Sequence, residues 1–277
     1  MRPPCVMRPG MRNASHAAKT PGHHHYRQGA VKVRRHSPGL GPRVRVRPWA
    51  FDERVVHLAL ADQAIVPHPE ELEQWVETLI DTRPRLSTIR TGALFPAAAA
   101  RFVDAGFITV DTLALLRVEL AGRTVVAPPV TSRLLGRRHH DASLIDRAAF
   151  GDNWANDARD LADIRHATPS HRARGRFVRR AAGEPGKRRR LVGFAISGAA
   201  GGQGYLQRLA VVPEHQREGH GRALALDALA WMRRRRLSHG VVNTAVTNAP
   251  ALTLYESLGF RRLAEELLVM QLDVTTR

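Results

Sequence analysis

An internal repeat is the feature that most restricts how this chain folds. Residues 86–120 and 241–274 each read as a strand, a turn with proline, a short helix, a Gly-Phe pair and a long apolar strand. Phe102 of the first copy then takes the place of Tyr255 in the second. Only the second copy follows a glycine-containing turn, at residues 216–221. The sequence predicts a duplicated unit, the alternative being a chance match of two generic strand–helix–strand segments.

Hydrophobic spacing predicts alternating helices and strands along the folded part of the chain. The clearest pattern is that of the helix expected at 68–81, which has acids in its first turn and a regular apolar face. The expected helices are 51–62, 68–81, 96–105, 141–164, 222–236 and 249–258. The expected strands are 86–94, 107–120 (a strand or a hairpin), 191–198, 205–212, 240–247 and 260–274, with a linker and an entering strand in 121–140 and a glycine hairpin at 199–204. This mixture predicts an α/β fold.

Positive charge is concentrated near the N-terminus. The formal net charge is +18, and residues 1–48 hold eleven of the 43 lysines and arginines but no acid. With several prolines and little apolar periodicity, this stretch predicts a disordered basic tail. A nucleic-acid-binding arm is one alternative, and a start codon placed too far upstream is another. Because the charge is so uneven, we do not expect nucleic acid to be the partner of the folded part.

Cysteine content and hydropathy exclude several classes of protein. Cys5 is the only cysteine, so the chain forms no intrachain disulfide and no cysteine-based zinc cluster, which fits a reducing cytoplasm. No run of 18 apolar residues indicates a membrane span, and no apolar segment indicates a secretory signal. The histidines at 23–25 lack fixed neighbours, so no metal site is predicted. We expect a cytoplasmic protein, and the excess of arginine over lysine suggests a bacterial one.

The stretch QREGHG, residues 216–221, joins an apolar strand to a helix. A helix leaves its first N–H groups without partners, and its dipole adds positive charge at that end, so helix N-termini bind phosphate. Glycines at 219 and 221 let an anion approach the backbone, and Arg217 and Arg222 add charge at the rim. The stretch matches neither the Walker loop nor the GxGxxG fingerprint. It predicts a site for a diphosphate.

Two ordered motifs resemble those of the GNAT superfamily of N-acetyltransferases. The pyrophosphate signature Q/R-x-x-G-x-G/A is met by Gln216, Gly219 and Gly221. The second element, N-x-x-A-x-x-L-Y-x-x-x-G-F, is met by Asn248, Ala251, Leu254, Tyr255, Gly259 and Phe260. The resemblance covers residues 130–277, whereas residues 49–120 resemble only the C-terminal half of such a domain.

The resemblance implies a fold, a cofactor and a division of the chain. It implies a mixed, splayed β-sheet flanked by helices and preceded by a partial repeat of the same unit. Residues 1–48 would be the tail, 49–122 a degenerate half-domain and 123–277 the N-acetyltransferase domain. Acetyl-CoA would be the co-substrate. Its pantetheine arm would pair with backbone groups at Leu209 and Val211, and its pyrophosphate would bind the amides of 217–222. Asn248 would cap the following helix and contact the cofactor.

The resemblance also implies acyl transfer to a primary amine by direct attack in a ternary complex. Tyr255 would be the acid for the leaving thiolate; the plainer alternative is that its ring only packs on the sheet. An amide at Leu209 or Val211 would polarise the thioester carbonyl. No general base is assigned among Asp146, Asp152 and Glu184. The acceptor, a small molecule or a peptide, is not identified by the sequence. A non-catalytic acyl-CoA sensor is the alternative function.

Overall fold

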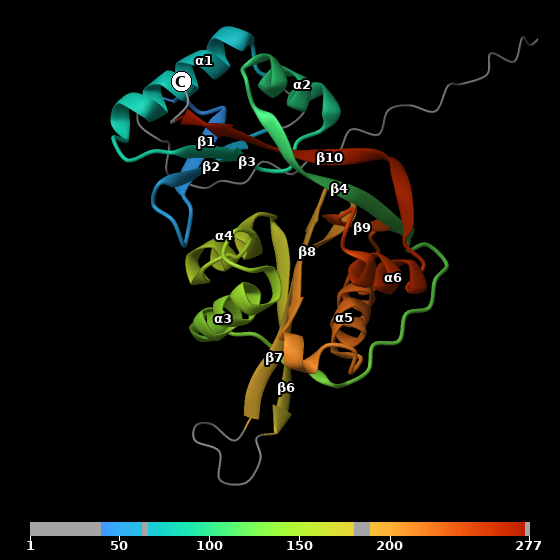
Figure 1. Ribbon diagram of the computed structural model, residues 1–277. Coiled ribbons are helices and arrows are strands. Elements are labelled where there is room, and N and C mark those ends of the chain that lie inside the picture. Colours follow the sequence, from blue (N-terminus) through green and yellow to red (C-terminus); the bar gives the residue numbers. More distant parts are fainter. Residues whose placement is uncertain (1–39, 63–65, 180–188, 275–277) are drawn as a thin grey trace, which may run out of the picture.

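A computed structural model describes residues 40–62, 66–179 and 189–274 of the 277-residue chain. Ten strands form one mixed sheet, with helices on both faces (Figure 1). The strands are β1 Val44–Pro48, β2 Val55–Leu60, β3 Thr88–Thr91, β4 Ile108–Glu119, β5 Thr131–Arg133, β6 Ser170–Arg179, β7 Arg189–Ala200, β8 Gln203–Val211, β9 His239–Ala245 and β10 Arg261–Asp273. The helices are α1 Pro69–Thr82, α2 Pro96–Asp104, α3 His139–Phe150, α4 Ala158–His166, α5 His220–Arg234 and α6 Ala249–Ser257, with 3-10 turns at Gly136–Arg138 and Pro213–His215.

The two repeat copies exchange their last strands. The sheet order is β1-β2-β3-β10-β4-β9-β8-β7-β6-β5. In the first copy β3 and α2 lead to β4, yet β10 lies between β3 and β4. In the second copy β9 and α6 lead to β10, yet β4 lies between β9 and β10. The long strands β4 and β10 pair with each other in antiparallel fashion. The predicted partial repeat is therefore present, and each copy completes the sheet of the other.

The core clusters follow this exchange. Met270 and Leu272 of β10 are buried in the N-terminal core with α1 and α2. Leu116 and Val118 of β4 are buried in the core beneath α5. Burial of apolar side chains is the main stabilising term in folding. Because each core contains side chains from the other copy's strand, we expect the two halves to unfold together.

Two expectations for the N-terminal half were wrong. Residues 51–62 were expected to be helical, but Val55–Leu60 forms β2, with alternate residues buried between β1 and β3. Val44–Pro48 was assigned to the disordered tail, but it forms β1, and Val44 and Val46 are buried. The alternation Val-Arg-Val-Arg puts valines on the core face and arginines on the other, which is the period of a strand. The rest of the tail lies outside the described residues.

The other predicted elements are close to the observed ones. Helix 68–81 is α1, with Leu72, Trp75, Val76 and Leu79 buried. The segment 107–120 is a single strand, and the segment 141–164 divides into most of α3 and most of α4. The predicted division after residue 122 falls in the turn that follows β4. None of the helices in the described part of the chain is long and apolar enough to cross a membrane.

The shared sheet predicts a single unfolding transition. Leu116 on β4 is fully buried beneath α5, whereas Val110 on the same strand is 36% exposed. Leu116→Ala should reduce the free energy of unfolding by about 2–5 kcal/mol, because it leaves a cavity in the core. Val110→Ala, the control, should change it by less than about 0.5 kcal/mol. Urea titration should show one cooperative transition; two separate transitions, with only one shifted, would contradict the exchange of strands.

A partly buried histidine on β2, His57, predicts a pH dependence of stability. Burial lowers the pKa of His57 to about 4, and the charges of Arg47 and Arg90 contribute in the same direction. The unfolded chain, with a histidine pKa near 6.5, then binds more protons than the folded chain below that pH. Stability is therefore full above about pH 6.5, and roughly 2–3 kcal/mol should be lost as the pH falls towards 4. His57→Gln should lose less stability over this range in urea titrations; equal losses would disprove the assignment.

Candidate functional site

The strands β8 and β9 separate at the centre of the sheet. They pair in parallel only from Gln203 to Tyr205, opposite His239 to Val241. Beyond this point β8 continues along β7, and β9 continues along β4 (Figure 1). The Val212 N–H donates to Val192 on β7, so by alternation the backbone groups of Leu209 and Val211 point away from β7, towards the gap. The resemblance implies that the pantetheine arm would pair with these two residues, and this assignment stays a prediction.

The glycine turn lies at the end of β8, at the N-terminus of α5. Gly219 is the N-cap of α5 and has φ of 78°, a conformation that favours glycine. Arg217 also has a positive φ, 66°, which is uncommon for a residue with a side chain. The first intrahelical bond of α5 runs from Ala223 N–H to the Gly219 carbonyl, so the N–H groups of residues 220–222 have no acceptor within the helix.

Gly221 serves a different purpose from Gly219. Its φ is not positive, and a Cβ added there would meet Leu254 at 3.4 Å, Leu209 at 3.8 Å and Val211 at 3.9 Å, which are ordinary contacts. The folded chain by itself therefore does not require glycine at 221. The Cβ direction points towards the side chains of Leu209 and Val211 on β8 and Leu254 on α6. The first motif and Leu254 of the second are thus brought together.

Three other predicted residues have contacts within the protein. The Gln216 side-chain N–H donates to the Val211 carbonyl at 3.2 Å and braces the turn against β8. Arg222 donates to the Ser257 hydroxyl at 3.0 Å, at the end of α6. Asn248 caps the start of α6 by accepting from Ala251 N–H at 3.2 Å. The predicted capping role is confirmed, but the nine-residue helix places Asn248 about 13 Å from the end that Arg222 contacts.

Tyr255 lies on α6 within the core cluster that contains Val211, and it is 5% exposed. Burial raises the pKa of its phenol to about 12, against a smaller lowering effect of the Arg208 charge. The phenol is therefore protonated at neutral pH. Its ring lies 5.7 Å from that of Phe260. The arrangement agrees both with proton donation and with the packing alternative.

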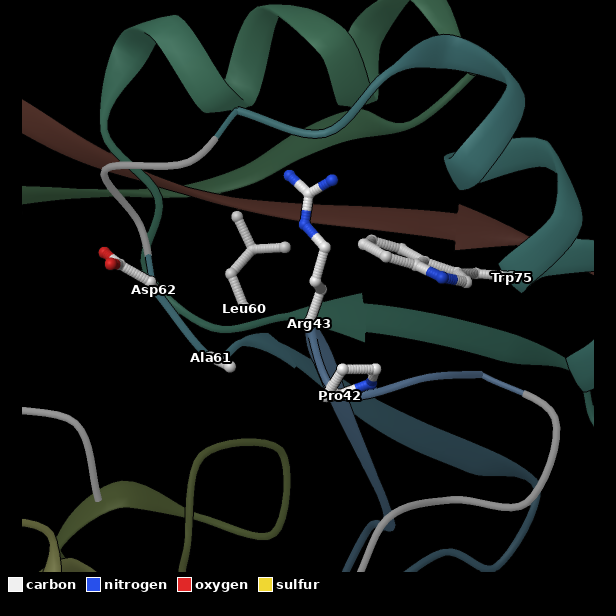
Figure 2. A pocket seen from close by; sticks show the side chains of 6 residues that line it. All are labelled: Pro42, Arg43, Leu60, Ala61, Asp62 and Trp75. Carbon is white, nitrogen blue, oxygen red and sulfur yellow. The ribbon is translucent and has the colours of Figure 1, made fainter. Parts of the chain in front are cut away.

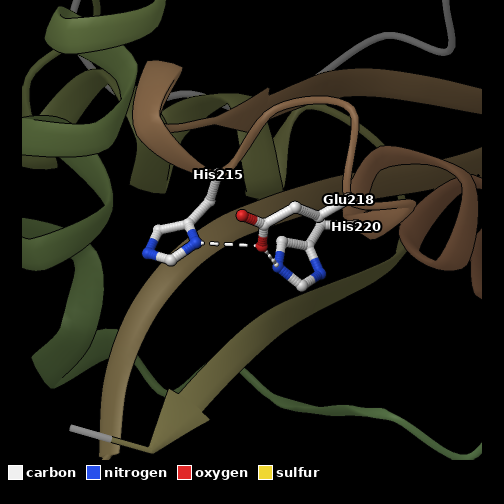
Figure 3. Close-up of side chains that lie close together, drawn as sticks. All are labelled: His215, Glu218 and His220. Carbon is white, nitrogen blue, oxygen red and sulfur yellow. Dashed lines mark hydrogen bonds and ion pairs between the residues drawn. The ribbon is translucent and has the colours of Figure 1, made fainter. Parts of the chain in front are cut away.

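The turn also contains a group that the sequence did not predict, formed by His215, Glu218 and His220 (Figure 3). Glu218 Oε2 lies 3.0 Å from His215 Nδ1 and 3.1 Å from His220 Nε2. Arg190 lies 2.6 Å from the other nitrogen of His215, and Arg176 donates to His220 Nδ1 at 3.2 Å. Since each arginine needs an acceptor, the ring N–H groups face Glu218. His215 is therefore hydrogen-bonded to Glu218, whereas His220 Nε2 lies close to the same oxygen without forming a hydrogen bond. The arginine neighbours disfavour a cation.

The three carboxylates considered as bases differ in position. Asp146 is fully buried and accepts from Arg208 at 2.8 and 2.7 Å and from Asn156 N–H at 2.7 Å. These bonds make it an anchor rather than a base. Asp152 is exposed and pairs with Arg147, and Glu184 lies outside the described residues.

A pocket of about 180 Å³ in the N-terminal half contains none of the predicted residues; Pro42, Arg43, Leu60, Ala61, Asp62 and Trp75 line it (Figure 2).

The two glycines of the turn predict different effects on stability. Gly219→Ala should lower the free energy of unfolding by about 1 kcal/mol, because alanine is strained at this positive φ. Gly221→Ala should leave it unchanged or raise it slightly, because alanine favours a helix and its methyl group fits. Thermal unfolding of both variants measures the difference. Equal destabilisation by the two substitutions would show that residue 221 is also fixed by the fold.

Comparisons with known proteins agree with this geometry. Residues 142–260 match the sequence model of the Acetyltransferase (GNAT) family. Mycothiol acetyltransferase of Thermobispora bispora is 33% identical over 136 residues, which are 46% of this chain and 44% of that protein. The [ribosomal protein bS18]-alanine N-acetyltransferase of Escherichia coli K12 is 35% identical over 71 residues, 26% of this chain and 48% of that protein. The chain thus spans less than half the length of these curated relatives.

Solved structures extend the similarity to the N-terminal half. A tandem GNAT protein from the clavulanic acid biosynthesis pathway aligns with a TM-score of 0.54 at 14% identity, covering 79% of this chain and 75% of the other. A GCN5-related N-acetyltransferase from Sphaerobacter thermophilus gives the same TM-score and identity, with 83% and 75% covered. These likenesses concern the fold. Residues 142–260 are thus similar to the Acetyltransferase (GNAT) family, and the fold is similar to that of these two solved structures.

Proposed function

We propose that this chain is an N-acetyltransferase that moves the acetyl group of acetyl-CoA to a primary amine. The observation that carries the proposal is the junction of the opened β8 edge with the bare N-terminus of α5. Amides at a helix N-terminus suit the pyrophosphate of the coenzyme, and Arg217 and Arg222 would add charge there. The edge of β8 at Leu209 and Val211 is not paired with β9 and suits the amide-containing pantetheine arm, which would bind as an added strand.

The reaction follows from what these groups can do. The acceptor nitrogen attacks the thioester carbonyl carbon, so that a C–N bond forms and the C–S bond breaks. A backbone N–H of Leu209 or Val211 stabilises the negative charge on the carbonyl oxygen. The nitrogen loses a proton, and the departing sulfur gains one.

Tyr255 would transfer the proton to sulfur. A phenol with a pKa of about 12 is a weaker acid than a thiol of ordinary pKa near 8.5. It would therefore not give up its proton alone; it donates to the sulfur as the attacking amine supplies a replacement. The transfer from Tyr255 to the sulfur and the transfer from the amine to Tyr255 would therefore occur together, in one ternary complex.

Tyr255→Phe tests this assignment. The variant should bind acetyl-CoA with an unchanged dissociation constant, while thiol release with a competent amine falls by about 10²-fold or more. Tyr205→Phe is the matched control, because Tyr205 is also a buried tyrosine but lies where β8 and β9 still pair; it should keep its turnover. Undiminished turnover in Tyr255→Phe would leave the ring with a packing role only.

An amine panel separates catalysis from the alternative, a non-catalytic acyl-CoA sensor. The missing base is what favours the alternative, because the fully buried Asp146 is already bonded to Arg208 and Asn156. We expect sustained release of CoA thiol with small-molecule or peptide amines and no release without an amine. Binding of acetyl-CoA with no release for any amine would favour the sensor. The acceptor is left to this experiment.

A further inference from the structure

Besides the pairing of β4 with β9 and of β3 and β4 with β10, the N-terminal half contacts residues 123–277 at a second place, formed by the end of α3, the loop 151–157 and the start of α4. Figure 1 shows the connection between β1 and β2 reaching down beside α4. Arg47 on β1 pairs with Asp160 at 3.3 Å and with Asp163 at 2.7 Å. The Arg147 guanidinium lies 4.8 Å from the centre of the Phe51 ring. These contacts flank the loop on both sides.

Three successive carbonyl groups of this loop are each bound by a side chain from another element. The Trp49 indole N–H donates to the Asp152 carbonyl at 3.0 Å. Arg90 on β3 donates to the Asn153 carbonyl at 2.8 Å. Arg208 on β8 donates to the Trp154 carbonyl at 2.9 Å. A loop normally turns its backbone groups to water, whereas these three carbonyl groups are fixed by side chains of the protein. Two of the three donors come from the N-terminal half.

Arg90 is the centre of the contact. Its guanidinium lies 5.4 Å from the Trp49 ring and 5.0 Å from the Trp154 ring. Its remaining nitrogens donate to Gln271 Oε1 on β10 at 3.1 and 2.8 Å. Only the planar fork of arginine can stack on rings and bond in two directions at once. Arg90 therefore joins the loop, the first strand pair and the exchanged strand β10.

The other side of the loop leads to the opened edge of β8. Arg208 precedes Leu209, and its side chain is held by the fully buried Asp146. Asp146 also accepts from the Asn156 N–H, within the same loop. The Arg208 charge acts on the phenol of Tyr255. The loop thus lies between the N-terminal half and the residues next to the reacting groups.

We propose that the N-terminal half is a platform that positions loop 151–157 as a wall of the acceptor site, with Arg90 as the positioning residue. This inference rests on the proposed function. It assigns a task to a half that lacks the glycine turn and carries Phe102 in place of the tyrosine. Arg90 touches neither cofactor nor reacting atoms; it acts through the loop backbone. Acetyl-CoA would bind the turn 216–221 and the backbone at Leu209 and Val211, and Arg90 donates to none of these groups.

Hydrogen exchange on the full chain tests the platform without any assay of activity. In Arg90→Gln, amides of residues 151–157 should exchange about tenfold faster, as expected from losing one anchoring bond, while those of α5 keep their rates. Trp49→Phe keeps an aromatic ring and removes only the N–H donor, so it should give a smaller effect in the same loop. Arg101→Gln on exposed α2 is the control. Unchanged exchange of the loop in both test variants would overturn the platform, whether or not the chain is an acetyltransferase.

Kinetics test the connection to the acceptor. With an amine found in the panel, Arg90→Gln should raise the KM for that amine about tenfold and leave the dissociation constant of acetyl-CoA unchanged. Arg90→Lys keeps the charge but not the fork, and should behave like Arg90→Gln. Faster loop exchange with an unchanged KM would show that the loop is positioned but is no acceptor wall. An inactive wild-type chain would refute the proposed function and not the platform, which the exchange experiment decides.

Discussion

The antiparallel pairing of β4 with β10 is the interaction on which the rest of the structure depends. Each of these strands leaves its own copy of the repeat and fills the gap in the other. Met270 completes the N-terminal core, and Leu116 completes the core under α5. The pairing therefore makes one sheet from two incomplete ones, and it fixes β9 on β4. Because β8 follows β7 instead, the sheet opens between β8 and β9, and the candidate site lies at that opening.

The site is composed mainly of backbone. Gly219 places the start of α5 at the end of β8, and Gly221 packs beside Leu254 of α6. The surrounding side chains hold this arrangement: Gln216 ties the turn to β8, and Glu218 joins the histidines on either side of it. Under the proposed function, such a site would recognise a coenzyme by its phosphates and amides. The amine acceptor would be recognised elsewhere, next to loop 151–157, which explains why no motif identifies it.

The sequence predicted those parts of the structure that depend on local pattern. Helix α1 was predicted because its apolar face and acidic first turn are properties of its own residues. The turn at 216–221 was predicted because closely spaced glycines before a helix indicate an exposed backbone that suits an anion. Strand β2 was missed because its apolar residues fit the period of a helix as well as that of a strand. Its partner β1 was missed because residues 1–48 were assigned to a disordered tail from their overall charge. The strand exchange and the Asp146–Arg208 pair depend on tertiary contacts, which no local pattern reveals.

Calorimetric titration of the purified chain with CoA and with pantetheine, which lacks the pyrophosphate, tests the central claim most directly. If the bare amides at the start of α5 hold the two phosphates, CoA should bind in a saturable manner and about 100-fold or more tighter than pantetheine. Equal affinities, or no heat with CoA at all, would contradict the claim that this helix terminus is a cofactor site.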